Sequence, residues 1–227
     1  MQKRSSTKRI ATLAMLAAIA YIVMLLSHLI PIFSFIPATP FLKYDPKDVI
    51  VAIGGFLMGP MAALSVTVVV NAIEMVTISA TGIIGFIMNT ISTAAFACTA
   101  AAIYKKNRTM KGAVLGLVVG VVAMTAVMLL WNYLITPLYM KVGRDVIVSL
   151  LLPAFLPFNL IKAAANAALT LLLYKPVVRG LRRANLVPQS NTASAAPKKG
   201  VSTGVMIVAA LLLVTCILLV LAINGVI

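Results

Sequence analysis

Asn159, Lys162 and Asn166 are spaced at i, i+3 and i+7 within the apolar run 153–174. This spacing places the three polar side chains on one face of a helix. A lysine in hydrocarbon costs about 2.5–3.5 kcal/mol on insertion scales, so Lys162 is expected to face a protein interior or a cavity that accepts its hydrogen bonds. The stripe therefore predicts one wall of a polar site. The alternative interpretation is that Lys162 only ties helices together.

Other apolar runs carry further amides and one carboxylate. Glu74 is the only carboxylate expected within a membrane span, which makes it the candidate counter-charge for Lys162 or a direct ligand group. Because an asparagine side chain both donates and accepts hydrogen bonds, a set of amides suits a neutral small molecule better than a proton or a metal ion. The amides are Asn71, Asn89, Asn132, Asn159 and Asn166.

The sequence carries no pattern typical of an enzyme or a metal site. His28 is the only histidine, and neither a Walker motif nor HExxH occurs. Cys98 and Cys216 lack CxxC spacing, so a disulfide framework or zinc site is not indicated. We therefore expect no enzymatic activity, no ATP hydrolysis by this chain and no bound cofactor or metal.

The composition indicates an all-α integral membrane protein. Hydrophobic residues make up 62% of the 227 residues, charged residues only 10%, and the mean hydropathy is +1.10. The formal net charge is +15, but the Lys and Arg residues cluster at the ends of apolar runs instead of along a polar face. This placement favours the lipid bilayer as the partner and excludes nucleic acid.

Apolar runs separated by proline, glycine or basic residues predict six core helices and a seventh. Their expected ranges are about 10–29, 48–58, 61–78, 84–104, 112–136, 148–174 and 201–223. The second run is too short to cross about 30 Å of hydrocarbon unless its neighbours complete the span. We divide the chain into a basic tail (1–9), a six-helix substrate-binding core (10–178), a flexible linker (179–200) and an additional transmembrane helix (201–227).

Two segments of this core carry surfaces for further contacts. Residues 30–47 contain four prolines and four aromatic residues, which exclude a regular helix. The segment is either a loop that covers a pocket or an interfacial anchor. In the first helix Ala11, Ala14 and Ala18 share one face, and this strip of small residues packs either within the chain or against a partner subunit.

The distribution of charge predicts the orientation in the membrane. Most Lys and Arg residues lie in the N-terminal tail, after residue 104 and after residue 174. Three of the four acids, Asp45, Asp48 and Asp145, lie in segments expected on the other side. The asymmetry predicts a cytoplasmic N-terminus and a C-terminus outside.

Several motifs in order resemble the substrate-binding (S) components of energy-coupling factor (ECF) vitamin transporters, and among these the riboflavin-binding members. The resemblance covers about residues 8–178. It rests on FLKYDPKD from Phe41, GGFLMGP ending at Pro60, MN at Met88, WNYLITPLY from Trp131 and PFNLIK from Pro157.

The resemblance implies a six-helix S-component bundle in the plasma membrane, with an outward-facing pocket closed by the loop between the first two helices. In that family, groups that match Asn132, Asn159 and Lys162 hold the isoalloxazine ring of riboflavin. The matching part of the loop comprises Leu42, Lys43, Tyr44 and Asp45. With Glu74, Asn89 and Asn166, these form the expected set of substrate-binding residues.

The family also implies partners. S components dock on a transmembrane coupling subunit through an alanine motif, which Ala14 and Ala18 match, and two cytoplasmic ATPase subunits drive the complex. The linker and the seventh helix have no counterpart in the usual six-helix pattern. Two other functions stay open: an S component for another vitamin, such as thiamine, biotin or a pantothenate-like acid, and a non-transporting membrane scaffold.

Overall fold

The computed structural model describes residues 2–29, 42–183 and 203–223, and these residues form helices without any strand. Six stretches are long and apolar enough to cross a membrane. They are Thr7–His28, Pro60–Thr77, Gly82–Lys106, Met110–Leu134, Arg144–Leu181 and Thr203–Ile223. The expected class, an all-α membrane bundle with an additional C-terminal helix, is confirmed.

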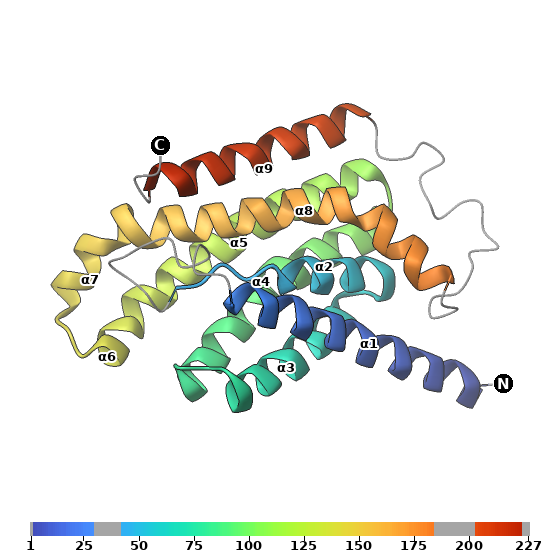
Figure 1. Ribbon diagram of the computed structural model, residues 1–227, viewed down its shortest axis with the longest axis horizontal. Helices are drawn as coiled ribbons and strands as arrows, with labels where there is room; N and C mark the ends of the chain where they lie inside the picture. The colour runs from blue at the N-terminus through green and yellow to red at the C-terminus, as the bar shows by residue number, and fades with distance from the viewer. Residues whose placement is uncertain (1, 30–41, 184–202, 224–227) are drawn as a thin grey trace.

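The helices run along the long axis of the molecule (Figure 1). In chain order they are α1 (Gln2–His28), α2 (Lys47–Met58), α3 (Pro60–Thr77), α4 (Gly82–Lys106), α5 (Met110–Leu134), α6 (Thr136–Met140), α7 (Arg144–Leu150), a π-helical turn η2 (Leu151–Phe155), α8 (Leu156–Arg183) and α9 (Thr203–Ile223). Helix α1 begins at the end of the bundle where α8 finishes, and α9 finishes at the opposite end (Figure 1).

Two predicted boundaries are wrong. The expected tail 1–9 is helical from Gln2, and the expected linker from residue 179 begins with the last turn of α8, which continues to Arg183. Both segments are rich in arginine, lysine or leucine, which are good helix formers, and contain no proline. The rest of the linker and most of the expected loop 30–47 lie outside the described residues.

The predicted helix 148–174 is longer and less regular than expected. Pro157 has no N–H to donate to the carbonyl of Pro153, so the regular α-helical pattern cannot continue through this turn. The chain instead forms the π-helical turn η2 between α7 and α8. The Asn159 side chain takes part in this adjustment, because its Nδ2 donates to the Phe155 carbonyl at 2.8 Å.

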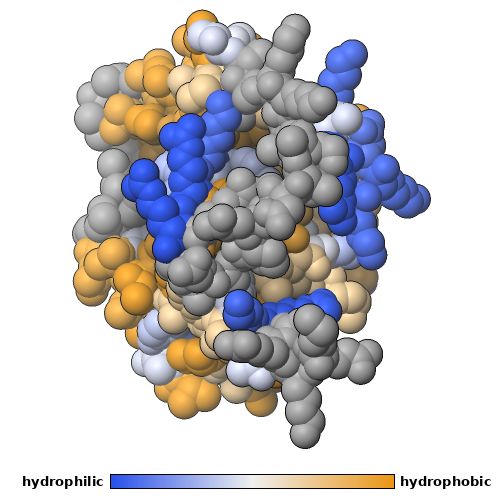
Figure 2. All heavy atoms as spheres, turned by 90° about the vertical axis from the view of Figure 1, so that its right-hand side faces the viewer, coloured by the Kyte–Doolittle hydropathy of each residue, from blue (hydrophilic) through white to orange (hydrophobic). Residues whose placement is uncertain are grey.

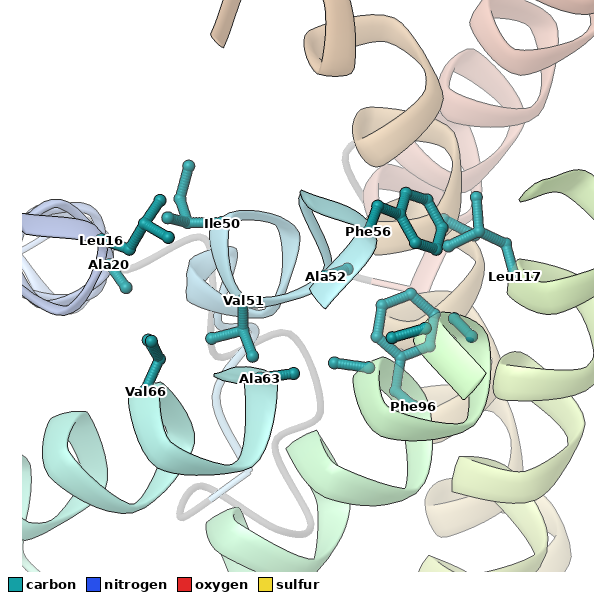
Figure 3. Close-up of a cluster of buried hydrophobic side chains, with 14 of the residues drawn as sticks. Leu16, Ala20, Ile50, Val51, Ala52, Phe56, Ala63, Val66, Phe96 and Leu117 are labelled. Atoms are coloured by element: carbon teal, nitrogen blue, oxygen red, sulfur yellow. The ribbon is translucent and has the colours of Figure 1, made fainter. Parts of the chain in front are cut away.

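Helix α2 is the centre of the bundle although it is the shortest core helix. Its twelve residues span about 18 Å, and α1, α3, α4 and α8 surround it. Ile50, Val51 and Phe56 pack against side chains of these neighbours (Figure 3). Gly59 ends the helix at φ 95°, a conformation that favours glycine, and Pro60 then starts α3. Because α2 is short and surrounded, its charged first turn lies inside the protein.

Helices α4 and α5 approach each other through glycine. A Cβ atom at Gly116 would lie 2.7 Å from the Ala100 carbonyl oxygen, and one at Gly120 would lie 2.7 Å from that of Phe96. Gly116 and Gly120 thus form a close-packing face of α5 toward α4. Gly112 instead lies beside the turn at Asn107.

The end of the bundle that carries the α4–α5 turn and the end of α8 is strongly basic. Figure 2 views the molecule from this end and shows hydrophilic side chains gathered on it. The exposed basic side chains of these elements are Lys105, Lys106, Arg108, Lys111, Arg179 and Arg183.

Helix α9 packs along α8 with a narrow contact. Ala209 and Cys216, seven residues apart, are its buried positions, whereas most of its other side chains are exposed. The additional helix therefore lies on the outside of the six-helix core instead of entering it (Figure 1).

The glycine contact predicts a matched pair of variants. Gly116→Ala is expected to destabilise the protein by about 1–3 kcal/mol, because the added methyl group meets the α4 backbone. Gly180→Ala is the control, since a Cβ there meets nothing within 4 Å. We expect it to be neutral or stabilising by roughly 0.5–1 kcal/mol. Denaturant titration in detergent measures both, and equal stabilities would contradict the prediction.

Candidate functional site

A cavity of about 350 Å³ lies at the end of the bundle opposite the α4–α5 turn. Its walls come from segment 42–46, from the ends of α1, α3 and α5, from the α3–α4 turn, from α6, and from the first halves of α4 and α8. The lining residues are His28, Leu42, Lys43, Asp45, Glu74, Ile78, Ser79, Ala80, Thr81, Met88, Asn89, Ser92, Met128, Tyr139, Phe158, Asn159 and Lys162. The cavity thus has polar groups on several helices and an apolar, partly aromatic remainder.

Most of the candidate residues lie in this cavity wall. Leu42, Lys43, Asp45, Glu74, Asn89, Asn159 and Lys162 line it. Tyr44, Asn132 and Asn166 are buried but are not among its lining residues. Met128 and Ser92 also line the cavity but were not predicted, because isolated apolar and hydroxyl residues give no periodic signal.

Lys47 is the residue at this site that the sequence analysis missed. It is 1% exposed, and its ammonium forms ion pairs with Asp45 and with Glu74, the latter at 2.9 Å. Glu74 therefore pairs with Lys47, not with Lys162 as expected. Its second carboxylate oxygen accepts a hydrogen bond from Asn89 Nδ2 at 2.9 Å. The only sequence signal for Lys47 was its place beside two aspartates in DPKD.

Asp48 anchors a second buried network behind the cavity. Its carboxylate accepts hydrogen bonds from Thr93 at 2.6 Å and from Asn166 Nδ2 at 3.3 Å. The Asn166 amide also donates to the Asp45 carbonyl at 3.3 Å and accepts from the Tyr44 hydroxyl at 2.8 Å. Asn166 thus supports segment 42–46 from behind, although it shares the helical stripe with Lys162.

Asn159 and Lys162 present polar groups to the cavity itself. The amide nitrogen of Asn159 donates to the Phe155 carbonyl. Its Oδ1, in contrast, takes part in none of the hydrogen bonds found among the described residues. Lys162 is 6% exposed, and neither ion pair found in the described part of the chain includes it. An amide oxygen and a lysine ammonium are therefore available to a bound molecule.

Asn132 is fully buried and does not line the cavity. Its Oδ1 accepts a hydrogen bond from Thr136, and among the described residues its Nδ2 has no partner although it is fully buried. Buried amide groups in proteins are nearly always paired.

The charge on Asp45 is stabilised by its neighbours. Burial alone would raise its pKa, but Lys47 and Lys162 nearby, together with hydrogen bonds from Lys47, hold the pKa of this carboxyl below its usual value. Asp45 is therefore ionised at neutral pH.

The arrangement suits binding more than catalysis. Met88, Met128 and Phe158 provide flat or adaptable apolar contacts, which fit an aromatic ring system. Polar groups at the edges then fix its orientation. In the described ranges no group of three or more His, Cys, Asp or Glu residues is arranged to hold a metal ion.

Comparisons with known proteins agree with one another. The family model for the substrate-specific component of ECF transporters matches residues 8–174. Riboflavin transporter RibU of Staphylococcus aureus (strain TCH60) is 32% identical over 182 residues, covering 78% of this chain and 93% of the relative. Riboflavin transporter FmnP of Bacillus subtilis (strain 168) is 29% identical over 191 residues, covering 79% and 98%.

A solved structure of the S component of a bacterial ECF transporter is also similar. It has a TM-score of 0.64 and 34% identity, covering 78% of this chain and 99% of that chain. Helix α9 begins at Thr203, beyond the region that the family model matches.

The network behind the cavity predicts a stability difference. Thr93→Val is expected to lower the free energy of unfolding by about 1–3 kcal/mol, because it removes a hydrogen bond to the buried Asp48 carboxylate. Thr215→Val on the exposed face of α9 makes the same substitution where the hydroxyl bonds only to its own helix, and should change stability by at most about 0.5 kcal/mol. A thermal shift in detergent compares the two, and similar losses would argue against the network.

Proposed function

The chain belongs to the family of substrate-specific components of ECF transporters, and on this premise we propose that it captures riboflavin outside the cell and delivers it inward with a coupling subunit and ATPases. The observation that carries the proposal is the cavity in which Asn159 and Lys162 offer polar groups beside methionine and aromatic side chains. These groups match the hydrogen-bonding edge and the flat faces of an isoalloxazine ring. Two relatives named as riboflavin transporters support this choice of ligand.

We further propose that the cavity opens to the outside. The end of the bundle that bears the α4–α5 turn is basic, as Figure 2 shows, and basic residues favour the cytoplasmic side. The cavity lies at the other end. This orientation places the N-terminus in the cytoplasm and the end of α9 outside.

The proposed docking surface for a transmembrane coupling subunit is the alanine strip of α1. Ala14 and Ala18 are exposed, whereas Leu16 and Ala20 on the other side of α1 are buried in the core. The strip is therefore not used for packing among the described residues, which supports a partner helix as its contact. Two ATPase subunits on the cytoplasmic side would supply the energy.

Two alternatives make different predictions for the purified protein. An S component for another vitamin would bind that vitamin and remain colourless, whereas bound riboflavin is yellow. A scaffold would bind no ligand saturably. An absorbance spectrum of the protein, followed by titration with riboflavin, separates the three, and absence of flavin binding would refute the proposal.

Substitutions in the cavity should weaken riboflavin binding. Lys162→Ala and Asn159→Ala are each expected to reduce affinity at least about tenfold, or about 1.4 kcal/mol, because polar groups of the bound ligand lose their partners. Quenching of flavin fluorescence measures the affinity. Lys141→Ala removes an exposed lysine near α6 that does not line the cavity and serves as the control. If both cavity variants bind like the control, these residues are not part of the site.

Substitutions in the alanine strip should separate binding from uptake. Ala14→Leu combined with Ala18→Leu is expected to abolish riboflavin uptake by cells while affinity in detergent stays unchanged, because larger side chains prevent close helix approach. Ala210→Leu places the same side chain at an exposed alanine of α9 and should leave uptake intact. Normal uptake by the double variant would reject the docking surface.

A further inference from the structure

Lys47 bonds to both carboxylates that line the cavity. Its ammonium contacts Asp45, which precedes α2, and Glu74, which comes from α3. The backbone N–H of Lys47 also donates to Asp45 Oδ1 at 3.1 Å. Lys47 is itself not a lining residue, so it acts on the cavity only through these two carboxylates.

Lys162 belongs to the same cavity wall as these two carboxylates. It lines the cavity, and its charge acts on Asp45 and on Asp48, yet it is in neither of the ion pairs formed by the described residues. Asp45 lines the same cavity, and the positive charge of Lys162 acts on its carboxylate. Asp45 is thus a potential partner of Lys162 that another lysine already binds.

We propose that Lys47 is a positioning residue: by binding Asp45 and Glu74 it keeps the ammonium of Lys162 available for an acceptor group of the ligand. The inference rests on the proposed function, because riboflavin supplies that acceptor. Lys47, a side chain that does not line the cavity, thus contributes to the specificity of the cavity.

The balance of charge explains why Lys47 is needed. The two networks contain the carboxylates of Asp45, Asp48 and Glu74 and the ammonium group of Lys47, and the charge of Lys162 acts on Asp45 and Asp48 from the cavity wall. His28 at the end of α1 and the exposed Lys43 also face this region. Without Lys47, Lys162 would be the remaining buried cation beside three carboxylates. A buried carboxylate without a counter-charge is strongly unfavourable, so Asp45 would pair with Lys162.

Two double variants of equal net charge test this mechanism. Lys47→Met/Glu74→Gln leaves Asp45 ionised without its lysine, whereas Lys47→Met/Asp45→Asn removes the carboxylate that would capture Lys162. Each removes one cation and one anion, so both avoid the excess buried charge that could prevent Lys47→Met alone from folding. We expect the first to bind riboflavin at least about tenfold more weakly than the second.

A second measurement does not depend on riboflavin. Reductive methylation of the ligand-free proteins, quantified at Lys162 by mass spectrometry, reports whether its amine is paired. We expect Lys162 to react several-fold more slowly in Lys47→Met/Glu74→Gln than in Lys47→Met/Asp45→Asn or the unsubstituted protein. Equal reaction rates in the two double variants would overturn the inference, and so would equal affinities.

These outcomes separate the inference from the proposed function. If the unsubstituted protein binds no riboflavin, the proposed ligand is wrong, and the methylation rates alone decide whether Lys47 keeps Lys162 unpaired. If it binds riboflavin and the two double variants bind alike, the ligand stands and the role of Lys47 fails.

Discussion

The structure depends on a short helix that begins inside the membrane bundle. Helix α2 covers about 18 Å, little more than half of the hydrocarbon thickness, so its first turn cannot reach the surface. That turn carries Lys47 and Asp48, which are 1% and 0% exposed. Charges at such a depth require partners, and α3, α4 and α8 each supply one, in Glu74, Thr93 and Asn166. The arrangement of the surrounding helices therefore depends on the ion pair and hydrogen bonds that the first turn of α2 requires, as well as on apolar packing.

The same constraint creates the cavity. Segment 42–46 enters the bundle directly before α2 begins, and its Asp45 and Leu42 form part of the cavity wall. The Tyr44 side chain lies on the other side of the segment, where its hydroxyl donates a hydrogen bond to Asn166. One segment thus has a face toward the cavity and a face toward the supporting network. A ligand that orders the segment would transmit its effect directly to α2 and α8.

The sequence was sufficient to predict the helices and part of the site. Long apolar runs and the Gly59-Pro60 break located most helices to within two residues, because the membrane imposes their length and glycine and proline end them. The spacing of Asn159 and Lys162 correctly put them on one face, but it could not show that Asn166, one turn further, lies behind the cavity. Glu74 was expected to pair with Lys162 or to bind the ligand, and only the three-dimensional path of α2 shows that its partner is Lys47. The turn η2 was likewise not predicted, since two prolines four residues apart can kink a helix in several ways.

Helix α9 lies outside the region that the family model matches and adds a helix to the side of the core. It lies against α8, whereas α1 packs on α2 and α3, and Figure 1 shows the two helices on opposite sides of the bundle. The alanine strip of α1 and the lining residues of the cavity come from other elements. Its narrow contact through Ala209 and Cys216 also leaves most of its surface to lipid. Cys216 of α9 belongs to the same apolar cluster as Leu42 and Tyr44, so the additional helix supports segment 42–46 as well as α8.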